Sequence, residues 1–148
     1  LVGRADLMQF IDRVFYALTY QHESVGLAVA SACLRYYRDH DVAGEVARKG
    51  EIIRGLFDAA SASAGLSGRG VGPASRFELD FWNVGSVSTI DQQMVFFRAL
   101  LERGVLPVRV VLPCELLTDA DLVQVQHAFD YGCKQVARYL GAAPTPGG

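Results

Sequence analysis

Apolar residues recur every three or four positions along much of the chain, and this spacing predicts amphipathic helices. The predicted helices cover residues 4–13, 24–37, 42–65, 90–101 and 122–140. Small residues are frequent in the second of them, which indicates a helix packed closely on two sides. Gly104 and Gly141 are expected to end the last two helices.

Two other segments have strand patterns. Residues 77–82 alternate apolar with acidic side chains, and residues 105–112 are rich in β-branched side chains, with Pro107 indicating an edge strand or a bulge. Residues 66–72 are glycine-rich and predict a loop, and residues 1–2 could close a strand. Helices and strands do not alternate regularly, so the predicted class is α+β, or a two-layer α/β sandwich, without internal repeats or linkers.

Composition narrows the classes of function. The chain has 148 residues, of which 51% are hydrophobic, and a net charge of −2 with 14 basic residues scattered among 16 acidic ones. This is ordinary globular composition, and the absence of a basic cluster argues against nucleic-acid binding. No apolar run approaches the ~20 residues that span a bilayer, and no signal peptide opens the chain, so we expect no membrane partner and a cytoplasmic location.

Three cysteines and three histidines are too few and too far apart for a disulfide framework or a metal site. Cys33 and Cys133 fall within predicted helices and are interpreted as small core residues, whereas Cys114 follows a proline and is less readily assigned. We therefore expect no metal.

Two motifs have both a chemical and a structural interpretation. Residues 68–72 (GRGVG) could form a phosphate loop, but the segment lacks the preceding strand, the following helix and the Lys-Ser/Thr ending, which favours a flexible loop. Asp119 and Asp121 could be paired carboxylates, but both lie at a predicted helix start. There, Thr118 and Asp121 have the spacing of a capping box.

The polar turn Thr19–Glu23 (TYQHE) precedes the small-residue helix and leaves two hypotheses open. In the first, Thr19 or Ser24 caps the helix, Tyr20 packs, and Glu23 complements the helix dipole. In the second, the amides of the helix start and the threonine hydroxyl form a phosphate-binding corner. Composition does not decide between them.

The order of motifs resembles one enzyme family over nearly the whole chain. Residues 3–8 read GRADLM, the turn reads TYQHE, and residues 27–34 read LAVASACL. The motifs that follow in the same order are Asp41-Val42, Gly50, the loop at 68–72, the helix end LERGV at 101–105, and TDAD at 118–121. This succession is similar to the region after the cofactor lysine in class III pyridoxal-phosphate aminotransferases, and most similar to the branch that contains glutamate-1-semialdehyde aminomutase.

The resemblance implies a fold-type I enzyme with pyridoxal 5′-phosphate as cofactor and a small amino or oxo compound as substrate. Residues 1–22 would end the large cofactor domain and form the connecting turn. Residues 23–141 would form the interdomain helix and the small C-terminal domain, with a mostly antiparallel sheet, and residues 142–148 a frayed tail.

The resemblance also implies site residues and a homodimer with shared active sites. Thr19, with Tyr20 beside it, would contact the cofactor phosphate of the partner subunit. Gln21, His22 and Glu23 would lie at the substrate pocket. Gln21 and His22 stand where the family usually has smaller residues after the threonine and its aromatic neighbour.

This chain departs from the family in two further respects. Leu117 stands where this branch commonly has histidine, which leaves the substrate open. Lys49 and Lys134 are the only lysines, both are expected among polar surroundings on helices, and neither matches the Schiff-base lysine. The resemblance therefore implies a C-terminal portion that is inactive alone. The alternative is a stand-alone, non-catalytic binding or scaffold module, which should cover the apolar face of helix 24–37 within its own chain.

Overall fold

The computed structural model describes residues 3–15, 23–82 and 87–142, and the fold is given for these residues. Contacts divide the chain into two compact units, Leu1–His40 and Asp41–Gly148. Each unit is described by itself. The division groups the helix after residue 23 with the N-terminal unit, whereas the expected end of a cofactor domain at residue 22 stays a prediction.

The described residues of the first unit form three helical elements: α1 (Ala5–Met8), the 3₁₀ helix η1 (Ile11–Arg13) and α2 (Ser24–Asp39). The prediction of one helix over residues 4–13 was wrong, because the chain breaks into two single turns. The prediction for α2 was correct within two residues. No residue of these three elements is buried.

The expectation that α2 packs closely on two sides is not met within this unit, and Cys33, predicted as a core residue, is exposed. The reason is size. The one-turn elements α1 and η1 are too short to cover a helix of 16 residues. Val25, Leu27 and Leu34 accordingly keep more than half of their surface exposed.

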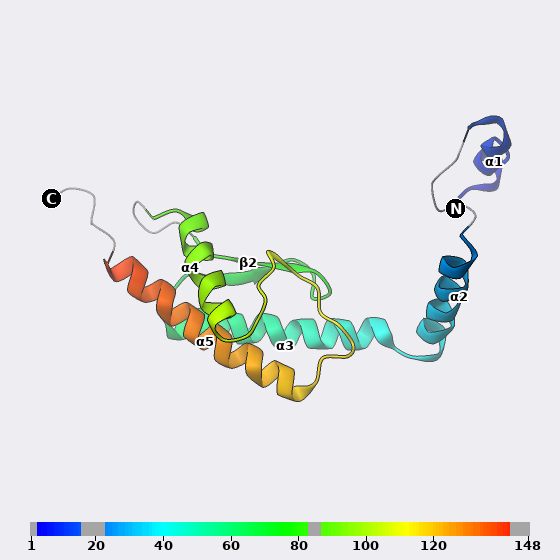
Figure 1. Cartoon of the computed structure of the whole chain (residues 1–148). Helices are drawn as coiled ribbons and strands as arrows, with labels where there is room; N and C mark the ends of the chain where they lie inside the picture. The colour runs from blue at the N-terminus through cyan, green and yellow to red at the C-terminus, as the bar shows by residue number, and fades with distance from the viewer. Residues whose placement is uncertain (1–2, 16–22, 83–86, 143–148) are drawn as a thin grey trace. The chain divides into compact units, whose positions relative to one another are not determined.

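The described residues of the second unit combine helices with a small sheet, and Figure 1 shows how these elements follow one another. Its elements in chain order are α3 (Val42–Ser63), β1 (Arg69–Val71), β2 (Phe77–Asp80), α4 (Thr89–Glu102), β3 (Val110–Val111) and α5 (Asp119–Ala142). The strands form an antiparallel sheet in the order β1-β2-β3, with Gly70 opposite Leu79 and Phe77 opposite Val111. The predicted α+β class is confirmed.

Three predicted elements of this unit need correction. The glycine-rich loop contains the strand β1, and Gly72 closes it with φ +128°, a conformation that favours glycine. The strand expected over residues 105–112 is reduced to β3, because Pro107 has no amide hydrogen for a ladder. Gly141 does not stop α5, which continues to Ala142.

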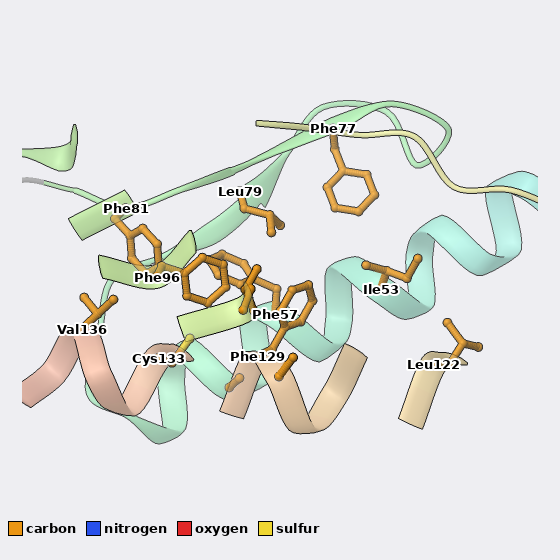
Figure 2. Close-up of a cluster of buried hydrophobic side chains, with 13 residues drawn as sticks. Ile53, Phe57, Phe77, Leu79, Phe81, Phe96, Leu122, Phe129, Cys133 and Val136 are labelled. Atoms are coloured by element: carbon orange, nitrogen blue, oxygen red, sulfur yellow. The ribbon is translucent and has the colours of Figure 1, made fainter. Parts of the chain in front are cut away.

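One hydrophobic core joins the sheet to the three helices, and Figure 2 shows the side chains that form it. Phe57 of α3 lies at its centre, with ring centroids 5.5 Å from Phe81, 5.5 Å from Phe96 and 5.6 Å from Phe129 in edge-to-face geometry. Such aromatic pairs each contribute about 0.5–1.5 kcal/mol beyond area burial. The buried face of β2, with Phe77 and Leu79, covers the same core, which gives the two layers.

None of the helices in the described ranges combines the length and the apolar character needed to cross a bilayer.

Candidate functional site

The polar turn before α2 is the first candidate site, and the structure describes only its last residue. Thr19, Tyr20, Gln21 and His22 lie outside the described residues, and their predicted roles stay predictions. Glu23 is the N-cap of α2. Its carboxylate accepts a hydrogen bond of 2.7 Å from the amide of Val25 and another from the amide of Gly26.

This geometry settles which described residue caps the helix. Ser24, one of the two N-caps expected from the sequence, is instead the first residue of α2. The N-cap, whose side chain makes the capping hydrogen bonds, is Glu23. The reason is reach, because the longer glutamate side chain folds back to two amides at once. Negative charge at this position also complements the helix dipole, as the first of the two hypotheses predicted for Glu23.

The same geometry bears on the phosphate-binding hypothesis. Two amides of the helix start, those of Val25 and Gly26, are already satisfied by a carboxylate. A phosphate at these amides would meet that negative charge. The described end of the turn therefore does not form a phosphate site, and any such site depends on Thr19 and its neighbours.

Neither lysine is placed to form a Schiff base. Lys49 of α3 has the expected polar surroundings but is buried: its amine donates to the carbonyl of Glu115 and lies 3.3 Å from a carboxylate oxygen of Glu45. Lys134 is exposed on α5. The residues that the structure describes thus do not fit pyridoxal phosphate by themselves, since they offer no free amine in an enclosed site.

The glycine-rich segment also binds no phosphate in the way a phosphate loop does, because its amides are engaged. The amide of Gly68 donates to Ser61 Oγ at 2.9 Å, and the amide of Gly70 donates to Asp58 Oδ1 at 2.8 Å. Both bonds tie β1 to α3. The preference for a structural role was correct, but the segment is an anchored strand and not a flexible loop.

The capping box before α5 is confirmed. The amide of Asp121 donates to Thr118 Oγ1 at 3.2 Å, and the carboxylate of Asp121 accepts from the amide of Thr118 at 2.8 Å and from its hydroxyl at 2.7 Å. These hydrogen bonds, with the amide first, lower the pKa of Asp121. Asp121 is a cap and not a catalytic carboxylate.

The cysteines and histidines that the structure describes form no metal centre. Within the described ranges, no group of three His, Cys, Asp or Glu side chains could hold a metal ion. Cys133 is a buried core residue, as predicted, and burial raises the pKa of its thiol to about 12. Cys114 is exposed, and its sulfur accepts a 3.4 Å hydrogen bond from the amide of Leu116.

Known proteins are similar to this chain in sequence and in fold. No family model matches the chain. The chain is 38% identical over 81 residues to 2′-deamino-2′-hydroxyneamine transaminase of Streptomyces kanamyceticus, a match that covers 55% of this chain and 21% of that protein.

Solved structures match over more of the chain. The pyridoxal-phosphate internal aldimine form of the FumI protein of Sphingopyxis sp. MTA144 matches with a TM-score of 0.81 and 19% identity, over 97% of this chain and 34% of that one. The β-phenylalanine aminotransferase of Variovorax paradoxus matches with a TM-score of 0.69 and 26% identity, over 86% of this chain and 33% of that one. The chain thus spans about a fifth of the curated relative and a third of these structures, and its fold is that of part of a pyridoxal-phosphate transaminase.

Proposed function

We propose that this chain is the C-terminal part of a pyridoxal-phosphate-dependent aminotransferase that acts on a small amino or oxo compound. The observation that carries the proposal is the structural match over 97% of this chain with a third of the pyridoxal-phosphate-bound FumI protein, together with the match over 86% of this chain with a third of an aminotransferase. The 38% identity to a transaminase over 81 residues supports it independently. The order of motifs from GRADLM to TDAD supports class III and the aminomutase-like branch.

The chain's own residues would contribute in two ways. Thr19, beside Tyr20, would bind the phosphate of the cofactor held in the partner subunit of a cytoplasmic homodimer. Gln21 and His22 would narrow the entrance of the substrate pocket. Glu23 would hold this turn in place through its bonds to the first turn of α2.

The cofactor, when bound, supplies the electron sink for moving an amino group between an amine and a carbonyl compound. The buried amine of Lys49 is engaged with Glu45 and Glu115 and would not serve it. We therefore infer that the lysine of the enzyme is not one of the two in this chain, and that residues 1–148 alone are inactive.

The stand-alone binding module remains the competing proposal. It requires the apolar face of α2 to be covered within the chain, and unit 1 alone leaves that helix without a buried residue. The binding module therefore requires residues outside the described part of unit 1 to cover α2.

The test uses the full-length protein that contains this chain. An absorbance band that borohydride removes, together with amino transfer to an oxo acid, would support the proposal. Thr19→Ala should then weaken cofactor retention, whereas Thr145→Ala, a matched threonine in the tail, should not. A protein that stays colourless with added pyridoxal phosphate and transfers no amino group would overturn the enzyme proposal in favour of the binding module.

A further inference from the structure

A polar groove runs between α4 and α5, and among its lining residues only Glu102 belongs to a motif of the sequence analysis, LERGV at 101–105. It has a volume of about 470 Å³ and is lined by side chains from both helices, among them Arg98, Glu102, Tyr131, Gln135, Arg138 and Tyr139. The two helices lie side by side in the second unit (Figure 1). A volume of this size suits a small metabolite.

Positive charge predominates around the groove. Arg98 and Arg138 come from opposite helices, and the guanidinium of Arg103 lies 3.9 Å from the ring centroid of Tyr131. Glu102 is the one acidic residue among the lining side chains. This local excess of cations contrasts with the net charge of −2 of the whole chain.

The carboxylate of Glu102 does not neutralise both arginines. It accepts from Tyr131 Oη at 3.0 Å and from Arg98 Nε at 3.3 Å. The side chain of Arg98 is 83% exposed, so this pair is weak and its guanidinium can turn toward a ligand. Arg138 has no ion pair among the residues that the structure describes.

The walls add apolar surface to these charges. The rings of Tyr131 and Tyr139 line the groove together with Val95. Two guanidinium groups offer the paired donors that carboxylates and phosphates accept, and aromatic rings offer a surface for an apolar body. We propose that the α4–α5 groove is a binding site for a small organic anion that carries a carboxylate or phosphate group on an aromatic or apolar body. This inference does not depend on the proposed aminotransferase activity.

Calorimetric titration of the full-length protein at low salt tests the proposal with two probes. Phenyl phosphate and phthalate share an aromatic body and differ in the anion, so the probe that binds better identifies phosphate or carboxylate as the preferred group. We expect saturable binding to one groove per chain that weakens as salt is added. Inorganic phosphate, which lacks the apolar body, should bind more weakly than phenyl phosphate.

Substitution of the two groove arginines tests whether the probes bind in the groove. Arg98→Gln and Arg138→Gln should each weaken binding about tenfold, the loss expected for one charge-assisted hydrogen bond. Arg109→Gln is the matched control, because Arg109 is an exposed arginine that pairs with Glu78 on the sheet and does not line the groove. Both groove arginines are exposed, so their variants should fold, and unchanged unfolding midpoints would confirm this.

Two results would overturn the proposal. One is the absence of saturable binding for both aromatic probes. The other is binding that Arg98→Gln and Arg138→Gln leave unchanged, or that Arg109→Gln weakens equally, because the anion would then bind elsewhere or through overall charge.

Discussion

Gly132 of α5 lies directly against the ring of Phe96 of α4: a Cβ atom on Gly132 would be 2.7 Å from two atoms of that ring. Phe96 is completely buried and packs against Phe57, Phe81 and Phe129, so the ring has little room to move. Gly132 therefore sets how closely these two helices approach, and with it the shape of the core.

Gly132→Ala should destabilise the second unit. Alanine favours the helix by about 1 kcal/mol over glycine, but overpacking of a filled core costs roughly 1–3 kcal/mol, so the net loss should be about 1 kcal/mol. Hydrogen exchange of the α4 and α5 amides in the full-length protein measures it. Gly55→Ala is the control, because a Cβ atom there meets nothing within 4 Å, and it should be neutral or stabilising. Equal protection in the two variants would contradict the role of Gly132.

Lys49 ties α3 to the segment before α5 through the carbonyl of Glu115. Lys49→Met keeps most of the volume and removes this hydrogen bond and the pair with Glu45. We expect a loss of about 1–3 kcal/mol, because a buried polar contact is lost. Exchange of amides near the start of α5 should quicken, whereas Lys134→Met, at an exposed position, should change stability by no more than about 0.5 kcal/mol. If both variants behave alike, the buried bond of Lys49 contributes nothing measurable.

Glu23→Ala should fray the first turn of α2. The carboxylate that accepts from the amides of Val25 and Gly26 is lost, and removal of an N-cap costs about 1 kcal/mol. Hydrogen exchange at these two amides should quicken, while exchange in α5 stays unchanged. Glu23→Asn should retain part of the protection, because asparagine is also a good cap. Unchanged exchange in Glu23→Ala would show that other groups hold the helix start.

The long helices of the second unit could be predicted from the sequence because their apolar residues recur at helical spacing on the face that packs into the core. Ile53 and Phe57 of α3 and Phe129 and Val136 of α5 are all buried, at positions where the apolar spacing placed the core face. The capping box predicted where α5 begins, since Thr118 and Asp121 make the hydrogen bonds that their spacing predicts.

The short elements could not be predicted in the same way. β1 consists of Arg69, Gly70 and Val71, and its place in the sheet depends on pairing with β2 and on the bonds from Gly68 and Gly70 to α3, which no local pattern encodes. The cap by Glu23 was missed because glutamate is not among the usual N-caps. The α4–α5 groove was missed because its arginines lie 40 positions apart in sequence and look there like ordinary surface residues.

The thiol of Cys133 gives a prediction that depends on pH. Burial raises its pKa from the ordinary 9.0 to about 12 in the folded chain, with a smaller contribution from the charge of Asp130. The unfolded chain therefore loses this proton first as the pH rises. The contribution of Cys133 to stability should be complete below pH 9.0 and should decline toward pH 12, by at most about 1.4 kcal/mol per pH unit. The measurement is the difference in stability between the wild type and Cys133→Ala, followed by hydrogen exchange across this pH window. Tyrosines and lysines titrate in both proteins, so their contributions to stability cancel in the difference.

Labelling provides the second readout for the same thiol. In the native protein at pH 8, peptide mapping after iodoacetamide treatment should find Cys114 alkylated and Cys133 unmodified, because only a thiolate that reagent can reach reacts quickly. Denaturation before labelling should make the two cysteines equally reactive, which controls for the peptides themselves. Rapid labelling of Cys133 in the native protein, together with a stability difference that does not change between neutral and alkaline pH, would contradict its burial against Phe96 and Val136 in the core.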